Sequence, residues 1–249
     1  MSVFFIPTDN ISDNELTITG SDVNHIKNVL RMKVGDVLSC NDSKGIVYNC
    51  RIKEFNDSEI LLDVLSKEES KAELSLKVSL FQGLPKADKM EMIIQKAVEM
   101  GVYDIYPVIN ERSVVKLDAR KASQKTERWQ KIAESAAKQS GRAIIPVVHE
   151  PVDYKKAVVL AKDEGKEILL PYENAEGMAY SKKVIENTVK RDSCAVFIGP
   201  EGGFSEAEVQ FAKENDAKII SLGHRILRTE TAGLFVMSVL SFECECMND

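Results

Sequence analysis

A glycine-rich segment with a carboxylate at its centre, Gly199-Pro200-Glu201-Gly202-Gly203, directly follows an apolar run. Glycine-rich turns between a strand and a helix often hold phosphates with backbone N–H groups. This segment lacks the Gly-Lys-Ser/Thr and Gly-x-Gly-x-x-Gly patterns of such turns, and Glu201 would repel a pyrophosphate. A carboxylate beside exposed backbone suits ribose hydroxyls, an ammonium group or a sulfonium instead. Some of the glycines also serve a tight turn, but the concentration of Gly, Pro and Glu favours a ligand-binding loop.

Two more segments of unusual composition follow apolar runs. They are Leu170-Pro171-Tyr172-Glu173 and the stretch 222–233, which carries Arg225, Arg228 and Glu230. Open parallel sheets bind ligands at the carboxyl ends of their strands, near the point where the strand order reverses. The three segments therefore predict one shared site at the edge of a parallel sheet.

From about residue 74 onward the chain alternates strand and helix patterns, which must position these segments. Apolar residues alternate over 74–80 and then recur at helical spacing over 90–98 until Gly101. Asp88 with Glu91, and Ser205 with Glu208, have the spacing of capping boxes. Such alternation predicts an α/β fold, with a parallel sheet and helices on both faces. Further strands are expected over 102–108, 144–148, 167–170, 195–198 and 218–222, and helices over 126–140, 154–162, from 205 onward, and over 230–242.

The first 70 residues have a different pattern, with short β-rich runs separated by polar turns. The runs cover 3–6, 37–40, 46–52 and 60–64. One helix is expected over 21–32, with Val23, Ile26, Val29 and Leu30 on one face. This is the pattern of a small β-barrel. The polar segment 66–71 then separates two predicted domains, residues 1–70 and residues 74–249.

Charge is unevenly distributed along the chain, whose net charge is −6. The stretch 112–142 has nine basic and three acidic residues, a net charge of +6, which leaves −12 for the remainder. An acidic protein binds nucleic acid only through a local basic surface. The stretch is therefore a candidate phosphate-facing surface, although such a charge run is also typical of a solvated helix face.

Cysteine use and hydropathy indicate a cytoplasmic protein without a metal centre. Cys40, Cys50 and Cys194 lie in apolar, strand-like runs, where buried free thiols are expected. An odd total of five argues against a disulfide framework, and the pair Cys244 and Cys246 has no second ligand pair for zinc. No apolar run approaches the roughly 20 residues that a membrane requires. The first seven residues also lack the basic lead of a signal peptide.

Several motifs, in this order along the chain, resemble one enzyme family. The segment 199–203, followed by Leu222-Gly223-x-Arg225-Ile226-Leu227-Arg228-x-Glu230-Thr231-Ala232, resembles the RsmE-type 16S ribosomal RNA (uracil-N3)-methyltransferases of the SPOUT superfamily. The motif His25-x-x-x-Val29-Leu30-Arg31-x-x-x-Gly35-Asp36 matches the PUA-like RNA-binding barrel of that family. The resemblance covers most of the chain. Its other matches are Lys86-x-Asp88-Lys89-Met90, Glu99-Met100-Gly101-Val102, Glu111-Arg112-Ser113, Arg128-Trp129 and Gln139-Ser140-x-Arg142.

The resemblance implies a parallel sheet with helices on both faces and a C-terminal trefoil knot, preceded by a small PUA-like β-barrel. It implies that the late loops hold S-adenosylmethionine and that the protein forms a homodimer beside that site. The final helix is apolar around much of its circumference, which agrees with a dimer, although burial in a large sheet domain would explain the same pattern. The residues expected to bind the methyl donor are Leu170, Pro171, Glu173, Ile198, Gly199, Pro200, Glu201, Gly203, Leu222, Gly223, Ile226, Leu227, Thr231 and Ala232.

The implied reaction is methylation of N3 of a uridine in 16S ribosomal RNA, as naked RNA or in the 30S subunit. The N3 proton must leave, so the site should stabilise an anionic ring, and a sulfonium donor needs no metal. Arg228 is expected to be the principal catalytic side chain, with Arg225 and Glu230 beside it, because a guanidinium stays charged and donates in a plane. Thr229 is expected to cap the helix that follows. The residues expected to contact RNA are Lys27, Arg31, Lys33, Arg112, Arg120, Lys121, Lys125 and Arg142, with Arg112 and Arg142 as further cations for the anionic ring.

The sequence leaves two alternatives. Ribose 2′-O methylation, within the same superfamily, would require a base that acts on a hydroxyl. A ribosome assembly factor without catalytic activity is the alternative from a different class. The presence of Glu201, Arg228 and Glu230 argues against the second alternative.

Overall fold

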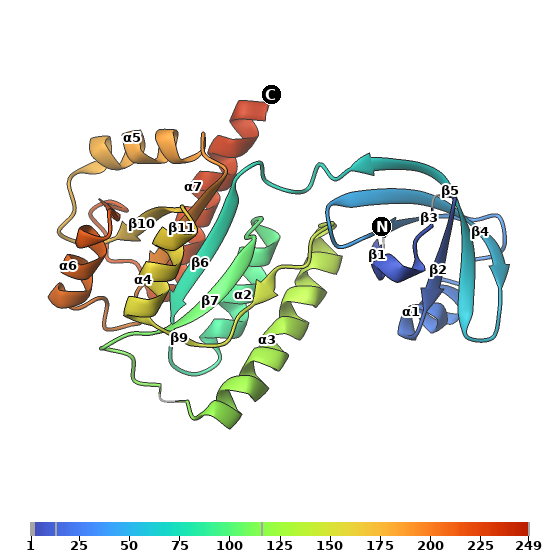
Figure 1. Cartoon of the computed structure of the whole chain (residues 1–249), viewed down its shortest axis with the longest axis horizontal. Coiled ribbons are helices and arrows are strands. Elements are labelled where there is room, and N and C mark those ends of the chain that lie inside the picture. The colour runs from blue at the N-terminus through green and yellow to red at the C-terminus, as the bar shows by residue number, and fades with distance from the viewer. Residues whose placement is uncertain (1–2, 13, 116, 249) are drawn as a thin grey trace. The chain divides into compact units, whose positions relative to one another are not determined.

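The computed structural model describes residues 3–12, 14–115 and 117–248, and the chain divides into two compact units, each with its own sheet (Figure 1). The first unit comprises Met1–Glu73 and Ala137–Ile145, and the second comprises Leu74–Ala136 and Pro146–Asp249. Residues 137–145 are far from the first 73 in sequence, yet they pack with them as one unit.

The first unit is built on a five-stranded sheet with the strand order β1-β3-β4-β5-β2. β1 pairs with β3 in parallel, and the other neighbours are antiparallel. Alternate residues point into the core, for example Leu16 and Ile18 in β2 and Ile60 and Leu62 in β5, all of which are fully buried. The strands are β1 (Val3–Phe5), β2 (Glu15–Thr19), β3 (Val37–Asn41), β4 (Ile46–Phe55) and β5 (Glu59–Glu69).

The helix that was expected over 21–32 is shorter and irregular. After the single turn η1 (Thr8–Asn10), the chain forms α1 (Ser21–Asn24), which passes directly into a π-helix, η2 (His25–Val29). The N–H of residue 30 donates to the carbonyl of residue 25, and this wider turn rotates the following side chains away from the predicted face. Val23 and Ile26 are therefore buried, whereas Val29 is 63% exposed and Leu30 is 39% exposed.

The second unit contains a seven-stranded sheet with the order β12-β10-β11-β6-β7-β8, in which β9 also pairs with β7. Every strand pair that the described residues form in this sheet is parallel, as the alternating pattern predicted. From β6 the chain continues to β7 and β8 on one side of the sheet and later returns to β10, β11 and β12 on the other side. The strand order therefore reverses at β6. The strands are β6 (Lys77–Gly83), β7 (Asp104–Ile109), β8 (Val147–Val148), β9 (Val152–Asp153), β10 (Glu167–Pro171), β11 (Ser193–Ile198) and β12 (Lys218–Ile220).

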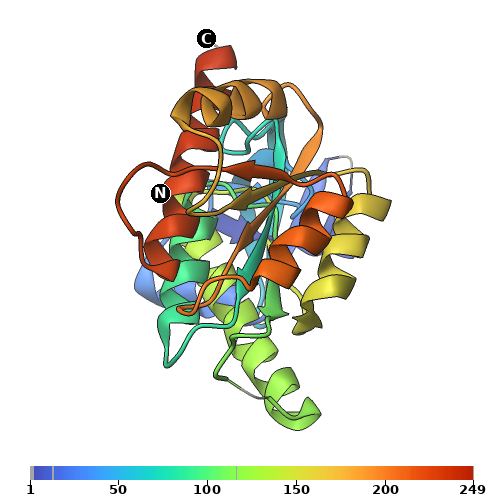
Figure 2. The ribbon, with the colours of Figure 1, turned by 90° about the vertical axis from the view of Figure 1, so that its left-hand side faces the viewer.

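Helices cover both faces of this sheet (Figure 2). α4 and α6 contact each other on one face, over a core that includes Phe81, Phe197 and Leu170. α2 and α7 contact each other on the other face, and α7 also contacts β11. The helices are α2 (Lys89–Glu99), α3 (Ala119–Ser140), α4 (Tyr154–Asp163), α5 (Met178–Thr188), α6 (Glu206–Glu214) and α7 (Thr229–Asn248). The trefoil knot is not tested by the strand order and stays a prediction.

One of the two expected capping boxes forms and the other does not. Ser205 and Glu208 make both reciprocal bonds at the start of α6, as predicted. At the start of α2, Asp88 makes no side-chain capping bond, because its ψ of 14° departs from the extended geometry of a cap. The Glu91 carboxylate lies instead 2.7 Å from Nη2 of Arg128 on α3. α3 also begins earlier than expected, at residue 119, and α7 ends later, at residue 248.

The expectations on cysteines are confirmed for Cys40, Cys50 and Cys194, which are buried free thiols. Of the C-terminal pair, Cys244 is buried and Cys246 is exposed. In the part of the chain that the structure describes, none of the helices is both long and apolar enough to cross a membrane.

Candidate active site

The three segments that the sequence predicted to share a site lie at one edge of the second unit's sheet. Parallel pairing aligns Pro171 with Ile220 and Ile198 with Gln82, so β10, β12, β11 and β6 all end at this edge. The segments 172–177, 199–205 and 221–228 leave these strand ends. We call this edge the carboxyl edge, and it is where open parallel sheets bind ligands.

Glu201 is held in an ionised state within the glycine-rich loop. Its Oε1 accepts from the backbone N–H of Lys86 at 3.1 Å and from Nζ of Lys89 at 3.0 Å. Burial acts to raise the pKa of Glu201, but the backbone N–H groups and Lys89 outweigh burial and hold the pKa below its usual value. The loop therefore presents a fixed anion at neutral pH.

Lys89 joins this loop to the start of α7. Its Nζ lies 3.0 Å from Oε1 of Glu201 and 3.3 Å from Oε2 of Glu230. The bonds to Glu201 and then to Glu230 raise the pKa of Lys89 above its usual value. The sequence predicts no bridging role for Lys89, because nothing in its helix indicates that its side chain contacts two later segments.

A buried amide connects the same two segments to β6. Gln82 is fully buried, and its Nε2 donates to Oγ1 of Thr229 at 2.9 Å and to the carbonyl of Gly83 at 3.0 Å. The Thr229 hydroxyl in turn donates to the carbonyl of Gly199 at 2.6 Å. The expectation that Thr229 caps α7 is wrong, because Thr229 is the first residue of the helix and the N–H groups of Thr231 and Ala232 donate to the carbonyl of Arg228. Sequence reasoning also missed Gln82, although a single amide in an apolar strand is itself a signal.

Gly83 allows the glycine-rich loop to approach the end of β6. A Cβ atom at this position would lie 2.6 Å from the backbone nitrogen of Pro200 and 2.7 Å from Oδ1 of Asn110, so no larger residue fits without a shift of the loop. Gly203 has a φ of +65°, a left-handed conformation that other residues rarely adopt. Both glycines thus fix the path of the loop.

Contacts from the segment after β7 also support the loop. Arg112 Nη1 donates to the carbonyl of Gly202 at 3.1 Å, which brings this predicted residue to the carboxyl edge. The Glu208 carboxylate accepts from the N–H of Glu111 and from Nδ2 of Asn110, both at 3.0 Å, and from the N–H of Ser205 at 2.8 Å. The buried carboxylate thereby ties α6 to the end of β7.

The expected catalytic residues lie together around the start of α7. Arg225 and Arg228 are exposed, and within the described part of the chain neither guanidinium has a hydrogen-bond or ion-pair partner. The side chain of Glu230 is 14% exposed and faces Lys89. The guanidinium groups of Arg225 and Arg228 can stabilise a negatively charged ring, and the carboxylate of Glu230 can accept a proton from it.

The expected donor-binding residues are all at the carboxyl edge, in different degrees of exposure. Ile226 stands out, because its side chain is 94% exposed. The buried residues of this set can contact a donor only through their backbone atoms or as an apolar surface beneath it. Leu170, Ile198 and Pro200 are buried, Pro171, Gly199, Gly203, Leu222, Gly223, Leu227 and Ala232 are half-buried, and Glu173, Glu201, Ile226 and Thr231 are exposed.

The expected RNA contacts in the second unit lie at the start of α3. Arg120 and Lys121 are exposed, and Lys121 is also 3.5 Å from Asp118. Lys125 lies over the Trp129 ring, 5.6 Å from its centroid. Lys116, which contributes to the charge of this stretch, lies outside the described residues. The exposure of Arg120 and Lys121 is expected both for a phosphate-facing surface and for a solvated helix face, so RNA binding by this stretch stays a prediction.

In the first unit, two of the three residues that were expected to contact RNA are exposed. Arg31 and Lys33 are exposed. Lys27 is half-buried, because its Nζ donates to the carbonyl of Asn56 at 2.6 Å and lies over the Phe55 ring. The ammonium group of Lys27 is thus used in contacts within the first unit.

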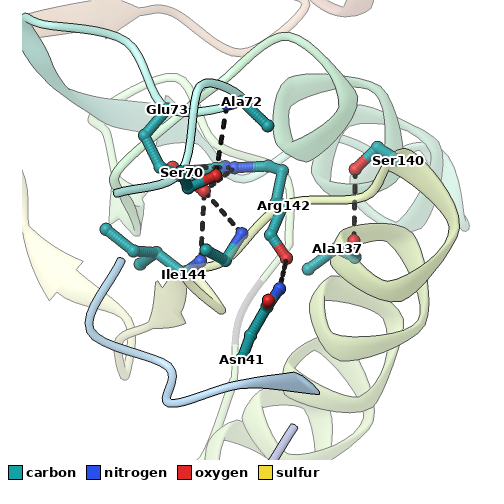
Figure 3. A network of polar contacts seen from close by, with 9 residues as sticks. Asn41, Ser70, Ala72, Glu73, Ala137, Ser140, Arg142 and Ile144 are labelled. Carbon is teal, nitrogen blue, oxygen red and sulfur yellow. Dashed lines mark hydrogen bonds and ion pairs between the residues drawn. The ribbon is translucent and has the colours of Figure 1, made fainter. Parts of the chain in front are cut away.

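Arg142 requires a correction, which Figure 3 illustrates. Its side chain is 3% exposed, and its guanidinium is paired with Glu73, with Nε 3.1 Å from Oε2. The same carboxylate accepts from the N–H groups of Ala143 and Ile144, and Nδ2 of Asn41 donates to the Arg142 carbonyl at 2.9 Å. The prediction that Arg142 contacts RNA or the uracil ring is wrong, because its buried charge is used to hold segment 137–145 in the first unit.

Comparison with known proteins agrees with this architecture. Residues 72–241 match the family model of the RNA methyltransferase domain, and residues 18–65 match that of the RNA methyltransferase PUA domain. The chain is 38% identical over 234 residues to Ribosomal RNA small subunit methyltransferase E of Bacillus subtilis, covering 93% of this chain and 91% of that protein.

Two solved structures are similar over nearly the whole chain. One is Ribosomal RNA small subunit methyltransferase E from Neisseria gonorrhoeae bound to S-adenosylmethionine, with a TM-score of 0.81, 30% identity, and 97% of each chain covered. The other is a methyltransferase from Legionella pneumophila in complex with the same cofactor, with a TM-score of 0.78, 31% identity, and 96% of each chain covered. The chain therefore belongs to the RNA methyltransferase family, with an RNA methyltransferase PUA domain preceding its methyltransferase domain.

Proposed function

We propose that this protein transfers a methyl group from S-adenosylmethionine to N3 of a uridine in the 16S ribosomal RNA of the small ribosomal subunit. Its similarity to small-subunit ribosomal RNA methyltransferases supports the substrate class. The observation that carries the proposal is the junction at the carboxyl edge. There the loop of Glu201 and the start of α7, with Arg228 and Glu230, are held together by Lys89 and Gln82.

The loops of the carboxyl edge fit S-adenosylmethionine. Glu201 is a fixed carboxylate beside half-buried glycine backbone, which suits ribose hydroxyls and a positively charged donor better than a phosphate. The segments 170–173, 198–203 and 222–232 would hold the donor. When bound, it supplies a methyl group on a positively charged sulfur.

The residues of α7 and the loop before it would then prepare the uracil. Arg228, assisted by Arg225, donates to a ring carbonyl oxygen and so favours loss of the N3 proton, which Glu230 or solvent accepts. The new bond forms between N3 and the methyl carbon while the bond from that carbon to sulfur breaks. Arg228 cannot itself act as the base, because a guanidinium keeps its proton at physiological pH.

RNA would be bound by cations of each unit separately. Arg31 and Lys33 are exposed in the first unit, as are Arg120 and Lys121 in the second, where the half-buried Lys125 lies beside them on α3. Each neutralised phosphate releases counterions, so the affinity should fall steeply with salt. Residues 1–70 would serve as the RNA-binding domain and residues 74–249 as the catalytic domain, in the cytoplasm, where ribosomal RNA is found.

We further propose a homodimer formed through α7. Its residues Phe235, Phe242 and Met247 are 37%, 66% and 53% exposed, which is a large apolar surface for a helix that also packs on a sheet. Light scattering at micromolar concentration should report a dimer, and a monomer would limit α7 to its packing within one chain.

A transfer assay with the purified protein tests the proposed reaction. Small-subunit RNA, or assembled subunits, and S-adenosylmethionine labelled in its methyl group are incubated with the protein. Nuclease digestion and mass spectrometry should then find the label in 3-methyluridine. Label in a 2′-O-methyl nucleoside would identify a ribose methyltransferase, and no label would leave a role in ribosome assembly without catalysis. Calorimetry in the presence of a chelator should show about one donor site per chain.

A further inference from the structure

A hollow lies in the second unit, at the end of the sheet opposite the carboxyl edge. It has a volume of about 710 Å³ and lies between α5 and the first residues of β10 and β12. None of the residues that were expected to bind the donor or RNA lines it. We call it the α5 pocket, and Figure 1 shows α5 above the sheet. Its lining residues are Glu167, Tyr180, Lys183, Val184, Asn187, Lys190, Arg191 and Lys218.

The α5 pocket is strongly basic in a chain whose net charge is −6. Four of its lining residues are cations and one is an anion. Nε of Arg191 lies 3.2 Å from Oε2 of Glu167, so these two charges compensate each other. Among the residues that the structure describes, Lys183, Lys190 and Lys218 have no ion-pair partner. Three ammonium groups around one hollow repel one another, and an anion bound among them would relieve this repulsion.

Two acidic side chains close to the pocket lysines in sequence form ion pairs with lysines outside the pocket. Glu186, on α5, lies 3.6 Å from Lys182, and Asp216, before β12, lies 2.9 Å from Lys162. Neither lines the α5 pocket. Asp216 also attracts Lys218, which reduces the positive charge of the pocket, but four cations against one anion in the lining leave it basic.

The remaining lining residues are suited to binding a nucleobase. Tyr180 is half-buried and offers an aromatic ring for stacking, and Val184 adds an apolar wall. The Asn187 amide can donate to and accept from a base edge. Cations that track phosphates together with an aromatic ring that stacks a base are the combination by which proteins hold single-stranded nucleic acid.

We infer that the α5 pocket binds a nucleotide of the RNA substrate, with its phosphates at Lys183, Lys190 and Lys218 and its base against Tyr180. The inference rests on the proposed function only in taking RNA as the substrate. It gives the enzyme an RNA anchor at the amino ends of β10 and β12, separate from the carboxyl edge where the methyl group is transferred. Such an anchor adds affinity for RNA without contact with the methyl donor.

The test compares two triple variants of the full chain with equal loss of charge. K183Q/K190Q/K218Q removes the three free cations of the pocket. K71Q/K156Q/K213Q removes three exposed lysines outside it that form no ion pair among the described residues. Binding of 16S ribosomal RNA transcribed in vitro is measured by filter retention at several salt concentrations, with circular dichroism to verify folding.

The pocket variant should bind this RNA about tenfold more weakly, and its plot of log affinity against log salt should be shallower by about 2. The control variant should keep the affinity and slope of the unchanged protein. Tyr180→Leu should weaken binding roughly tenfold, whereas Tyr180→Phe, which keeps the ring, should not. Affinity for S-adenosylmethionine should be unchanged in all four.

Equal losses in the two triple variants would overturn the inference, because general charge would then explain them. Tight binding of free uridine monophosphate to the pocket, with RNA affinity unchanged in K183Q/K190Q/K218Q, would also overturn it and indicate a small-molecule site. These readouts need no methylation. If the proposed methylation of uracil failed, the RNA-binding measurements would still show whether the α5 pocket binds RNA, so the two failures can be told apart.

Discussion

Gln82 and Thr229 are 147 residues apart in sequence, yet Nε2 of Gln82 lies 2.9 Å from Oγ1 of Thr229. Because Thr229 also donates to the carbonyl of Gly199, one buried chain of hydrogen bonds joins β6, the glycine-rich loop and the first residue of α7. Arg228 and Glu230 flank Thr229 on either side. Gln82, together with Lys89, therefore holds these candidate catalytic residues in position relative to the Glu201 loop.

Removing either end of this chain should destabilise the protein. Gln82→Leu removes the donor to Thr229 and should lower the free energy of unfolding by about 1 kcal/mol. Thr229→Val leaves the Gln82 amide and the Gly199 carbonyl without their partner and should cost about 1–3 kcal/mol. Denaturant unfolding measures both values. The double variant should lose less than the two losses combined, and a fully additive result would contradict a shared network.

Arg228→Lys tests the principal catalytic side chain. The lysine keeps the charge but loses the planar pair of donors, so the methylation rate should fall by roughly ten- to a thousandfold, the effect of losing one oriented donor. The affinity for S-adenosylmethionine, measured by calorimetry, should change much less. A rate equal to that of the unchanged enzyme would make Arg228 structural and would shift the role to Arg225.

Lys89→Met should change how the methyl-donor affinity depends on pH. Lys89 helps to hold the pKa of Glu201 below its usual value, so removal of the cation lets that pKa rise. As the pH is lowered, Glu201 is then protonated at a higher pH, and donor affinity should begin to fall at a higher pH than in the unchanged protein. Calorimetry between about pH 4 and 8 measures the shift, since free carboxyl groups titrate near the lower end of this range.

Lys86→Met is the matched control for this experiment. Lys86 also donates to Glu201, but through its backbone N–H, which the substitution keeps. Its pH profile should match that of the unchanged protein. Equal shifts in both variants would mean that general charge, and not the contact of Lys89, controls Glu201.

Glu73→Gln should destabilise the first unit. The substitution leaves the charge of Arg142 buried without its anion, which costs roughly 3–5 kcal/mol when a buried ion pair is broken. Lys138→Gln removes an ion pair in which the exposed Lys138 Nζ lies 3.7 Å from Oδ2 of Asp22, and it should cost no more than about 1 kcal/mol. Chemical unfolding of the two variants measures the difference, and equal small losses would contradict the structural role given to Arg142.

The general architecture was predictable because it depends on local patterns. Alternating apolar residues over 74–80 predicted a strand, which the structure places at β6, three residues later, and helical spacing followed by Gly101 predicted α2. A parallel sheet then follows from the order of elements. The loops at the strand ends then share an edge by geometry. For this reason Glu201 and Arg228 could be assigned to one site from the sequence.

The contacts that hold the site together were not predictable, because they join distant segments. Nothing near Gln82 or Lys89 in sequence indicates that they bond to residues over 100 positions later. Arg142 was misjudged for a related reason. It ends a basic stretch, but Glu73 lies within reach and compensates its charge, so it is buried. A count of charges along the chain cannot distinguish such a residue from the exposed Arg120.

Nucleoside analysis of the small-subunit ribosomal RNA from cells with and without this protein tests the central claim most directly. Complete digestion and mass spectrometry should find 3-methyluridine at one position in RNA from cells that have the protein and none at that position in cells that lack it. A gene copy carrying Arg228→Lys should restore little of the modification. The same amount of 3-methyluridine at that position in both cell types, or loss of a 2′-O-methyl nucleoside instead, would contradict the account.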